Sequence, residues 1–263
     1  MTDFDCVLIP LDGSQRAEAA LDWVRVLSAR QIRLLRVCPP ESEGDADAAR
    51  EYLAEAAARS CPPGAAVDVR VACGDPAERI VGEAAEADLI VMSTQGAGAG
   101  GRRLFGSVAD RVSRHAPVPT LLLRGGRAPV STTPLRRIVV PLDGSPSAER
   151  ALPLGMRLAA ILGAPLHLIS VHETPPDEAR RAAVAAYLDR EAAAVQTAGL
   201  RATTETRTGT PENELLAVVA PGDLLVITTH GRGAARRWQI GHVAEKLLRQ
   251  APVPVAMIRA DGQ

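Results

Sequence analysis

Two copies of a short polar motif carry the first candidate chemistry in this chain. Residues 9–14 read Ile-Pro-Leu-Asp-Gly-Ser and residues 140–145 read Val-Pro-Leu-Asp-Gly-Ser, in each case at the end of an apolar run. The serine of each motif is a typical helix N-cap, because its hydroxyl accepts a hydrogen bond from a free backbone amide. The aspartates, Asp12 and Asp143, could accept hydrogen bonds from ribose hydroxyls or hold a metal. We therefore expect both a capping role and a ligand role at this motif.

A second repeated pattern places glycines on either side of a loop. The first copy reads Met-Ser-Thr-Gln-Gly over residues 92–96 and, after nine residues, Gly-Ser-Val over residues 106–108. The second copy reads Ile-Thr-Thr-His-Gly over residues 227–231 and, after nine residues, Gly-His-Val over residues 241–243. Glycine lets the backbone approach an anion closely, and a helix N-terminus offers free N–H groups and the positive end of its dipole. The pattern predicts a phosphate cradle in each copy.

Two common nucleotide-binding motifs are excluded. Residues 96–101 match Gly-x-Gly-x-x-Gly, but this match follows the fourth expected strand instead of the first. The acidic residue that the dinucleotide fingerprint needs about 20 positions later is absent from residues 116–123. The chain holds a single lysine, Lys246, and no Gly-x-x-x-x-Gly-Lys loop, which excludes P-loop chemistry.

These motifs belong to a long internal repeat. Residues 114–124 recur at residues 249–259, and both segments contain Ala-Pro-Val-Pro. A repeat of this length indicates two copies of a whole domain, since solenoid repeats are far shorter. The joint is rich in Gly, Pro, Ser and Thr, as linkers are. We predict one domain over residues 1–125, a linker over 126–135, and a second domain over 136–263.

Each copy alternates short apolar runs with longer segments of helical period. This alternation predicts a five-stranded, doubly wound α/β domain in each copy, with a parallel sheet covered on both faces. Such sheets bind ligands outside the carboxyl ends of their strands, which is where both motifs lie. The expected strands are near 4–10, 32–38, 66–72, 87–93, 118–124, 137–142, 165–172, 201–207, 223–229 and 253–259, and the expected helices of the first copy are near 14–29, 45–59, 76–86 and 107–115.

Composition excludes several other functions. The net charge is −1 and aromatic residues make up 2% of the chain, so neither a basic nucleic-acid surface nor a base-stacking platform is expected. No apolar run reaches the ~20 residues of a membrane-spanning helix, and the N-terminal residues do not resemble a signal peptide. We expect a cytoplasmic protein with reduced cysteines. A thiol switch at Cys38 and Cys73 is an alternative, because both would end neighbouring strands.

With Asp-Gly-Ser, Gly-x-Pro, Asp-Leu-Ile-Val and Ala-Pro-Val-Pro segments in register twice, the chain resembles the universal stress protein family in its tandem two-domain form. The resemblance covers about residues 4–124 and 136–259. It implies the strand order 3-2-1-4-5 and binding of ATP or another adenine nucleotide, together with Mg²⁺, through a Gly-x2-Gly-x9-Gly-[Ser/Thr] motif. The residues that it implies for binding are Pro10, Leu11, Asp12, Val37, Met92, Ser93, Gly96, Gly106, Ser107 and Val108 in the first copy, and Pro141, Leu142, Asp143, Val171, Ile227, Thr228, Gly231, Gly241, His242 and Val243 in the second.

Two departures from the family motif set the copies apart. Its first glycine is Ser93 or Thr228 here, a position where a small residue serves. Its last position is Ser107 in the first copy and His242 in the second. A serine hydroxyl can cap the helix and donate to a phosphate, whereas histidine is bulkier and a poor cap. We therefore predict the first copy to be the better nucleotide site.

Three functions remain open from the sequence. The resemblance favours a nucleotide-binding regulator of the stress response, and neither a catalytic residue nor a protein-held metal is predicted. A slow Mg²⁺-dependent ATPase is one alternative, although no convincing base or nucleophile accompanies the cradle. A scaffold that binds no nucleotide is the other. The apolar segments 118–124 and 253–259 would protect each other as paired edges, which would make the domains an internal pseudo-dimer, with a further homodimer also open.

Overall fold

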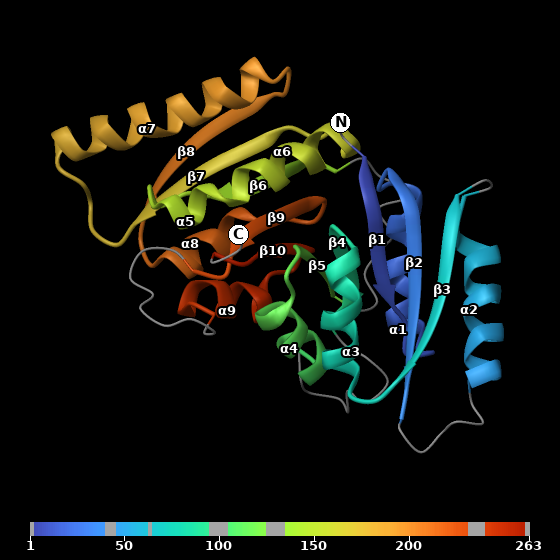
Figure 1. Ribbon diagram of the computed structural model, residues 1–263. Coiled ribbons are helices and arrows are strands. Elements are labelled where there is room, and N and C mark those ends of the chain that lie inside the picture. The colour runs from blue at the N-terminus through green and yellow to red at the C-terminus, as the bar shows by residue number, and fades with distance from the viewer. Residues whose placement is uncertain are drawn as a thin grey trace. The chain divides into compact units, whose positions relative to one another are not determined.

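The structure is a computed structural model that describes residues 3–39, 46–62, 65–94, 105–124, 135–230 and 240–260 (Figure 1). The chain divides into two compact units, Met1–Thr132 and Thr133–Gln263. The predicted linker over 126–135 falls almost wholly outside the described residues, so its bounds stay a prediction.

In the first unit, five strands pair in parallel in the order β3-β2-β1-β4-β5. This confirms the expected doubly wound sheet and its strand order. The elements are β1 (Phe4–Pro10), α1 (Gln15–Glu18), the 3-10 helix η1 (Ala19–Arg25), β2 (Ala29–Cys38), α2 (Ala46–Ser60), β3 (Ala66–Cys73), α3 (Pro76–Glu83), the 3-10 helix η3 (Ala84–Glu86), β4 (Leu89–Ser93), α4 (Ser107–His115) and β5 (Thr120–Leu123).

The second unit repeats this topology. Its strands also pair in parallel, in the order β8-β7-β6-β9-β10. Its elements are β6 (Arg137–Pro141), α5 (Pro146–Glu149), α6 (Ala151–Leu162), β7 (Leu166–His172), α7 (Glu178–Thr197), β8 (Ala202–Thr208), α8 (Pro211–Val218), β9 (Asp223–Thr228), α9 (His242–Gln250) and β10 (Val255–Ile258).

Helices cover both faces of the sheet in the first unit. Side chains alternate along a strand, so Arg33 and Arg36 on β2 point to opposite faces. Arg36 lies over the ring of Tyr52 on α2, with its Cζ 5.8 Å from the ring centroid. Arg33 instead forms an ion pair with Glu86 of η3, 3.0 Å from Nη1 to the carboxylate. Helix α2 and the α3–η3 segment therefore lie on opposite faces.

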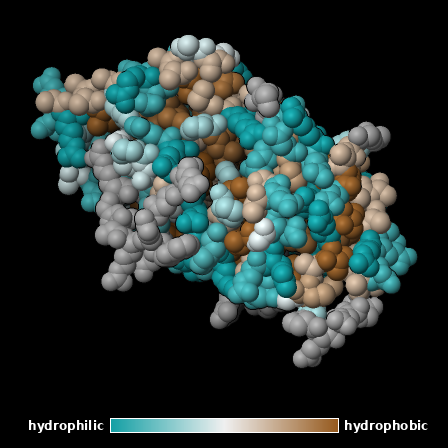
Figure 2. All heavy atoms as spheres, in the orientation of Figure 1, coloured by the Kyte–Doolittle hydropathy of each residue, from teal (hydrophilic) through white to brown (hydrophobic). Residues whose placement is uncertain are grey.

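The edge strands correct the expectation that both faces of every strand are covered. All residues of β4 and β9 are buried, whereas β3 and β8 consist of exposed and half-buried residues. An edge strand has one neighbouring strand instead of two, and β8 is largely polar in sequence. Among the described residues, Val67 on β3 is the only large hydrophobic side chain classed as exposed, at 36%. The face in Figure 2 is accordingly mostly hydrophilic, with smaller hydrophobic areas between.

The repeated Asp-Leu-Ile/Leu-Val segment joins neighbouring strands at the end of the sheet opposite the glycine motifs. In the first unit, a carboxylate oxygen of Asp88 accepts a hydrogen bond from the amide of Cys6 at 2.8 Å. In the second, the wholly buried Asp223 accepts from Arg136 Nε at 2.7 Å and from the amide of Ala220 at 3.1 Å. Burial alone would raise the pKa of Asp223, but the hydrogen bonds from Arg136 and Ala220 lower it below its ordinary value. This motif therefore has a structural role.

The two units differ in the segment that follows their first strand. In the first unit, the prediction of one helix over 14–29 is wrong. In the first unit this segment is mainly the 3-10 helix η1, and β2 begins where the predicted helix should end. Pro10 pairs with Leu35, 25 residues later, whereas Pro141 pairs with Ile169, 28 residues later. The first unit thus lacks the residues for about one further α-helical turn, and a 3-10 helix covers more length per residue.

Candidate functional site

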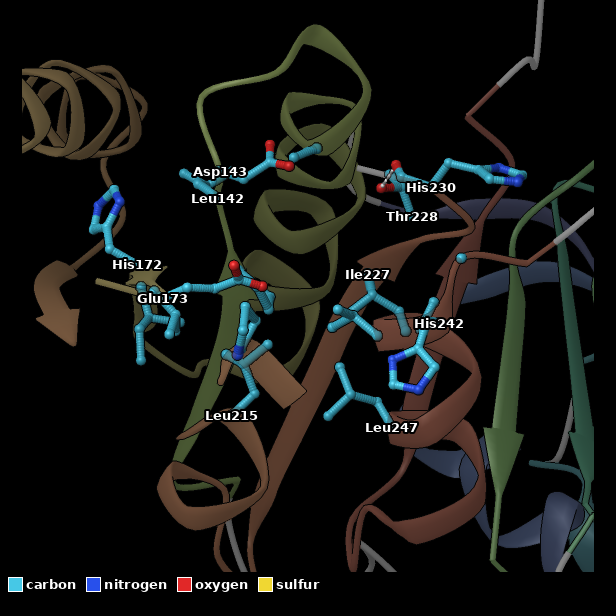
Figure 3. A pocket seen from close by; sticks show the side chains of 18 of the residues that line it. Leu142, Asp143, His172, Glu173, Leu215, Ile227, Thr228, His230, His242 and Leu247 are labelled. Atoms are coloured by element: carbon cyan, nitrogen blue, oxygen red, sulfur yellow. Dashed lines mark hydrogen bonds between the residues drawn. The ribbon is translucent and has the colours of Figure 1, made fainter. Parts of the chain in front are cut away.

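One cavity in the second unit lies at the carboxyl ends of β6, β7 and β9 and the start of α9 (Figure 3). Its volume of about 800 Å³ is within the usual range of small-molecule sites. Every binding residue predicted in the second copy lines this cavity, apart from Gly231, which is outside the described residues. The residues concerned are Pro141, Leu142, Asp143, Val171, Ile227, Thr228, Gly241, His242 and Val243.

The aspartate of each Asp-Gly-Ser motif closes a tight turn where the strand ends. Asp143 Oδ1 accepts a hydrogen bond from the amide of Ser145 at 2.9 Å, and Asp12 Oδ1 accepts from the amide of Ser14 at 2.9 Å and from its hydroxyl at 2.6 Å. The intervening glycines have φ values of 77° and 81°. The two serine side chains cap α5 and α1, as predicted. The aspartates therefore hold the turn in addition to any contact with a ligand.

The helix predicted at 107–115 is confirmed, but the residue that caps it is not the one expected. Gly241 is the N-cap of α9 and Gly106 is the N-cap of α4, so Ser107 and His242 are the first helical residues. The expectation that the Ser107 hydroxyl caps its helix is therefore wrong. The Gly241 amide donates to the carbonyl of Thr229 at 2.8 Å, so this N–H is already used within the fold. An anion would meet the N–H groups of the following turn, which have no intrahelical acceptor.

A buried carboxylate links α8 to α9 beside this helix start. Glu212 is 6% exposed, and its Oε1 lies 3.6 Å from Nδ1 of His242 and 3.5 Å from Nζ of Lys246. Lys246 Nζ also donates to Oδ1 of Asn213 at 2.8 Å. The His242 side chain itself is 79% exposed. This end of the cavity thus combines the N-terminus of α9 with the imidazole of His242, while Lys246 lies further along the same helix, beside Glu212.

Helix α8 reaches the cavity wall because the Gly-x-Pro segment turns the chain after β8. Gly209 has a φ of 149°, and a Cβ at this position would lie 2.7 Å from Oε1 of Glu214. Only glycine fits such a turn without strain. Pro211 then begins α8, and both Pro211 and Leu215 line the cavity. The repeated Gly-x-Pro signal could have identified this wall, which the sequence analysis did not assign to the site.

The cavity wall is largely apolar. Side chains of Ile169, Leu215, Ile240 and Leu247 join the predicted residues Leu142, Val171, Ile227 and Val243 in lining it. Polar and charged side chains also line it, among them His172, Glu173, Thr174 and Arg180. An apolar wall with a few polar groups and a helix N-terminus is suited to a ligand with a flat apolar part and an anionic part.

The first unit places its predicted residues at equivalent points of its own sheet. Pro10, Leu11 and Asp12 end β1, Val37 lies near the end of β2, and Met92 and Ser93 end β4. Gly106, Ser107 and Val108 form the start of α4. Gly96 lies outside the described residues, as do the loop arginines at 102 and 103 and their counterparts at 232, 236 and 237. The predicted preference for the first copy therefore stays a prediction, while the cavity itself is described in the second.

The structure places the two cysteines of the alternative thiol switch next to each other on neighbouring strands. Cys38 and Cys73 are paired residues of the neighbouring strands β2 and β3, at their carboxyl ends. Both are free thiols; Cys38 is buried and Cys73 half-buried. Their placement is the one that the strand order predicted, and a redox role for them stays a prediction.

No group of three or more His, Cys, Asp or Glu side chains within the described ranges could hold a metal ion. In the parts of the chain that the structure describes, no helix combines the length and the hydrophobicity needed to cross a membrane.

Comparison with known proteins gives consistent results. The model of the universal stress protein family matches residues 4–124 and 134–259. A universal stress protein of Mycobacterium tuberculosis is 25% identical over 291 residues, which cover 96% of either chain. One from Thermus aquaticus is 34% identical over 140 residues, covering 46% of this chain and 99% of its own. The crystal structure of a universal stress protein from Archaeoglobus fulgidus matches with a TM-score of 0.76 at 23% identity, covering 97% of this chain and 96% of that one.

Proposed function

Since this chain belongs to the universal stress protein family, matched once in each of its two units, we propose that it binds an adenine nucleotide, with ATP as the first candidate, and serves as a nucleotide-responsive regulator of the stress response. The cavity of the second unit supports this proposal, because it is lined by the residues implied for binding in that copy. Mg²⁺ would arrive with the phosphates of the nucleotide.

One observation supports this proposal: nine of the residues that the family resemblance implies for binding line one cavity of about 800 Å³. The base would lie against the apolar wall that includes Val171 and Ile227. Asp143 would accept hydrogen bonds from ribose hydroxyls, and the amides of His242 and Val243 would bind phosphate oxygens. The protein's contribution would be binding and orientation.

The test is a calorimetric titration of the full chain, stripped of any bound ligand, with Mg-ATP and then with AMP and cyclic AMP. Saturable binding supports the proposal, and the stoichiometry reports whether one or both units bind. Mg-GTP is the matched control for base selectivity, because the helix N-terminus recognises phosphate whatever the base. The absence of saturable binding for all adenine nucleotides would favour a scaffold that works without a nucleotide.

The corresponding residues of the first unit, such as Asp12 and Val37, would form the second site of a two-site protein. A stoichiometry of two would support that arrangement, and a stoichiometry of one would assign binding to a single unit. The cytoplasmic location and the pairing of the two units as a pseudo-dimer are part of the same proposal.

A further inference from the structure

A smaller cavity adjoins the candidate nucleotide site of the second unit. Its volume is about 290 Å³. It shares Asp143, His172 and Arg180 with the larger cavity. Its remaining lining comes from Gly144, Ser170, Ala183, Val184 and Tyr187. We call it the side cavity.

In the first unit, the side chain of Arg36 lies in the corresponding place. Its Nη1 is 3.5 Å from the carbonyl oxygen of Leu11, and its Cζ lies over the ring of Tyr52 at 5.8 Å from the centroid. A Cβ on Gly13 would lie only 3.0 Å from the same Nη1. The guanidinium group therefore packs between the Asp-Gly-Ser turn and a tyrosine of the following long helix.

The pairing of strands shows that Arg36 and Ser170 are equivalent. Arg36 follows Leu35, which pairs with Pro10, and Ser170 follows Ile169, which pairs with Pro141. The amide of Leu11 donates to Leu35 at 2.8 Å, and the amide of Leu142 donates to Ile169 at the same distance. The second unit therefore has a buried serine where the first unit has an arginine.

In the second unit, where Ser170 stands in place of the arginine, a tyrosine and a carboxylate still lie beside this position. Tyr187 lies on α7 as Tyr52 lies on α2, and both hydroxyls are buried without a hydrogen-bond partner among the described residues. Burial raises the pKa of each phenol, so both remain neutral at physiological pH. Asp143 supplies a carboxylate next to the cavity.

From this we propose that the side cavity of the second unit is a binding site for the guanidinium group of a small organic ligand. Such a group would take the place that Arg36 fills in the first unit. Arg190 already lies over the Tyr187 ring, with its Cζ 5.1 Å from the centroid, so a planar cation would contact the other face of this ring, next to the carboxylate of Asp143. This proposal does not rest on the proposed nucleotide site, although the two cavities share side chains.

Arg180 allows a test of whether the side cavity binds a cation or an anion. Its exposed side chain lies on the first turn of α7 and lines both cavities. As a like charge it opposes a second cation at the side cavity, whereas it would favour an anion. Arg180→Ala should therefore tighten the binding of a cationic probe, and weaker binding in this variant would overturn the assignment of a cation site.

The main experiment titrates the full chain with butylguanidinium and with butylurea, its neutral planar counterpart, by ligand-observed NMR at concentrations well below those that unfold proteins. We expect saturable binding of butylguanidinium and at least about tenfold weaker binding of butylurea, the scale of one charge-assisted hydrogen bond. Ser170→Arg, which supplies a guanidinium from the chain itself, should weaken butylguanidinium binding by at least about tenfold. Equal binding of the two probes, or an unchanged affinity in this variant, would overturn the proposal.

Arg36→Ser tests the proposal by a change in the first unit and leaves the second unit as it is. It opens the equivalent position beside Tyr52 and should add a second butylguanidinium site, which raises the stoichiometry from one to two. An unchanged stoichiometry in a folded Arg36→Ser protein would show that the guanidinium position is not a transferable site. Titration of each variant with Mg-ATP separates these outcomes from a failure of the proposed nucleotide site.

Discussion

Gly241→Val is the substitution that tests most directly how α9 would bind a phosphate. An N-cap side chain lies beside the amides of the first helical turn, which is why polar caps can accept hydrogen bonds from them. A valine in this place would cover these amides with methyl groups. The backbone tolerates the change, because Gly241 has a φ of −62° and a ψ of 151°, a conformation that β-branched residues adopt readily. Its Cβ would lie 3.4 Å from the carbonyl oxygen of Thr229.

The expected loss follows from the hydrogen bonds that remain available. The Gly241 amide is already bonded to Thr229, so a phosphate would depend on the amides of His242 and Val243. A hydrogen bond to a charged group contributes roughly 1.5 kcal/mol at the low end, so losing two costs about 3 kcal/mol and weakens binding about a hundredfold. The free energy of unfolding should fall by only about 1 kcal/mol, since glycine is a better N-cap than valine by about that amount.

The assay is calorimetric titration with Mg-ATP, paired with urea unfolding of the same preparations. Gly241→Ala is the matched control, because it adds the Cβ without the branched methyl groups and should retain most of the affinity. Gly106→Val makes the same change in the first unit, so the two valine variants assign each binding step to a unit. A Gly241→Val protein that is folded and keeps wild-type affinity and stoichiometry would refute the role given to the start of α9.

Three further predictions concern stability and are checked by urea unfolding. Burial, with Arg137 nearby, lowers the pKa of His167 below the ordinary histidine value of about 6.5. The unfolded chain therefore takes up this proton first, and the free energy of unfolding should fall as the pH drops below about 6.5. His167→Gln should reduce this dependence between pH 7.5 and 5.5. Asp223→Asn removes a wholly buried carboxylate that pairs with two arginines. Because both arginines reach solvent, the change should cost about 1–3 kcal/mol, the scale of the charged hydrogen bonds that are lost, and an unchanged stability would contradict the role described for this carboxylate. Gly209→Ala forces a Cβ to within 2.7 Å of a glutamate oxygen at a positive φ and should cost about 1–3 kcal/mol, so an unchanged unfolding midpoint would contradict the strain assigned to this turn.

Much of the fold could be predicted because its determinants are local and occur twice. The apolar runs that became β1, β4, β6 and β9 are buried strands, and the Asp-Gly-Ser turns after β1 and β6 lie where the alternating pattern placed them. The edge strands β3 and β8 lie where strands were predicted, at 66–72 and 201–207, but their exposure was not predicted. That exposure depends on the strand order, a long-range property that local hydrophobicity does not reveal.

The candidate site was predicted in its glycine motifs and strand ends, but not in its full extent. Leu215 and Leu247 are core-like helix residues in the sequence, and only the packing of α8 and α9 brings them to the cavity. The capping position was misassigned because Gly-Ser and Gly-His at a helix start do not reveal which residue lies outside the helix. The difference between Arg36 and Ser170 becomes informative only once strand pairing shows that the two are equivalent.

The two cavities of the second unit share the side chains of Asp143, His172 and Arg180. Ligands in cavities with a common wall are thermodynamically linked, because each ligand acts on groups that the other also contacts. The linkage is reciprocal: the factor by which a cation in the side cavity changes the affinity of the larger cavity equals the factor by which an anion there changes the affinity for the cation. Opposite charges on either side of Asp143 and Arg180 would make that factor greater than one. The second unit would then respond to two solutes jointly, as a coincidence detector.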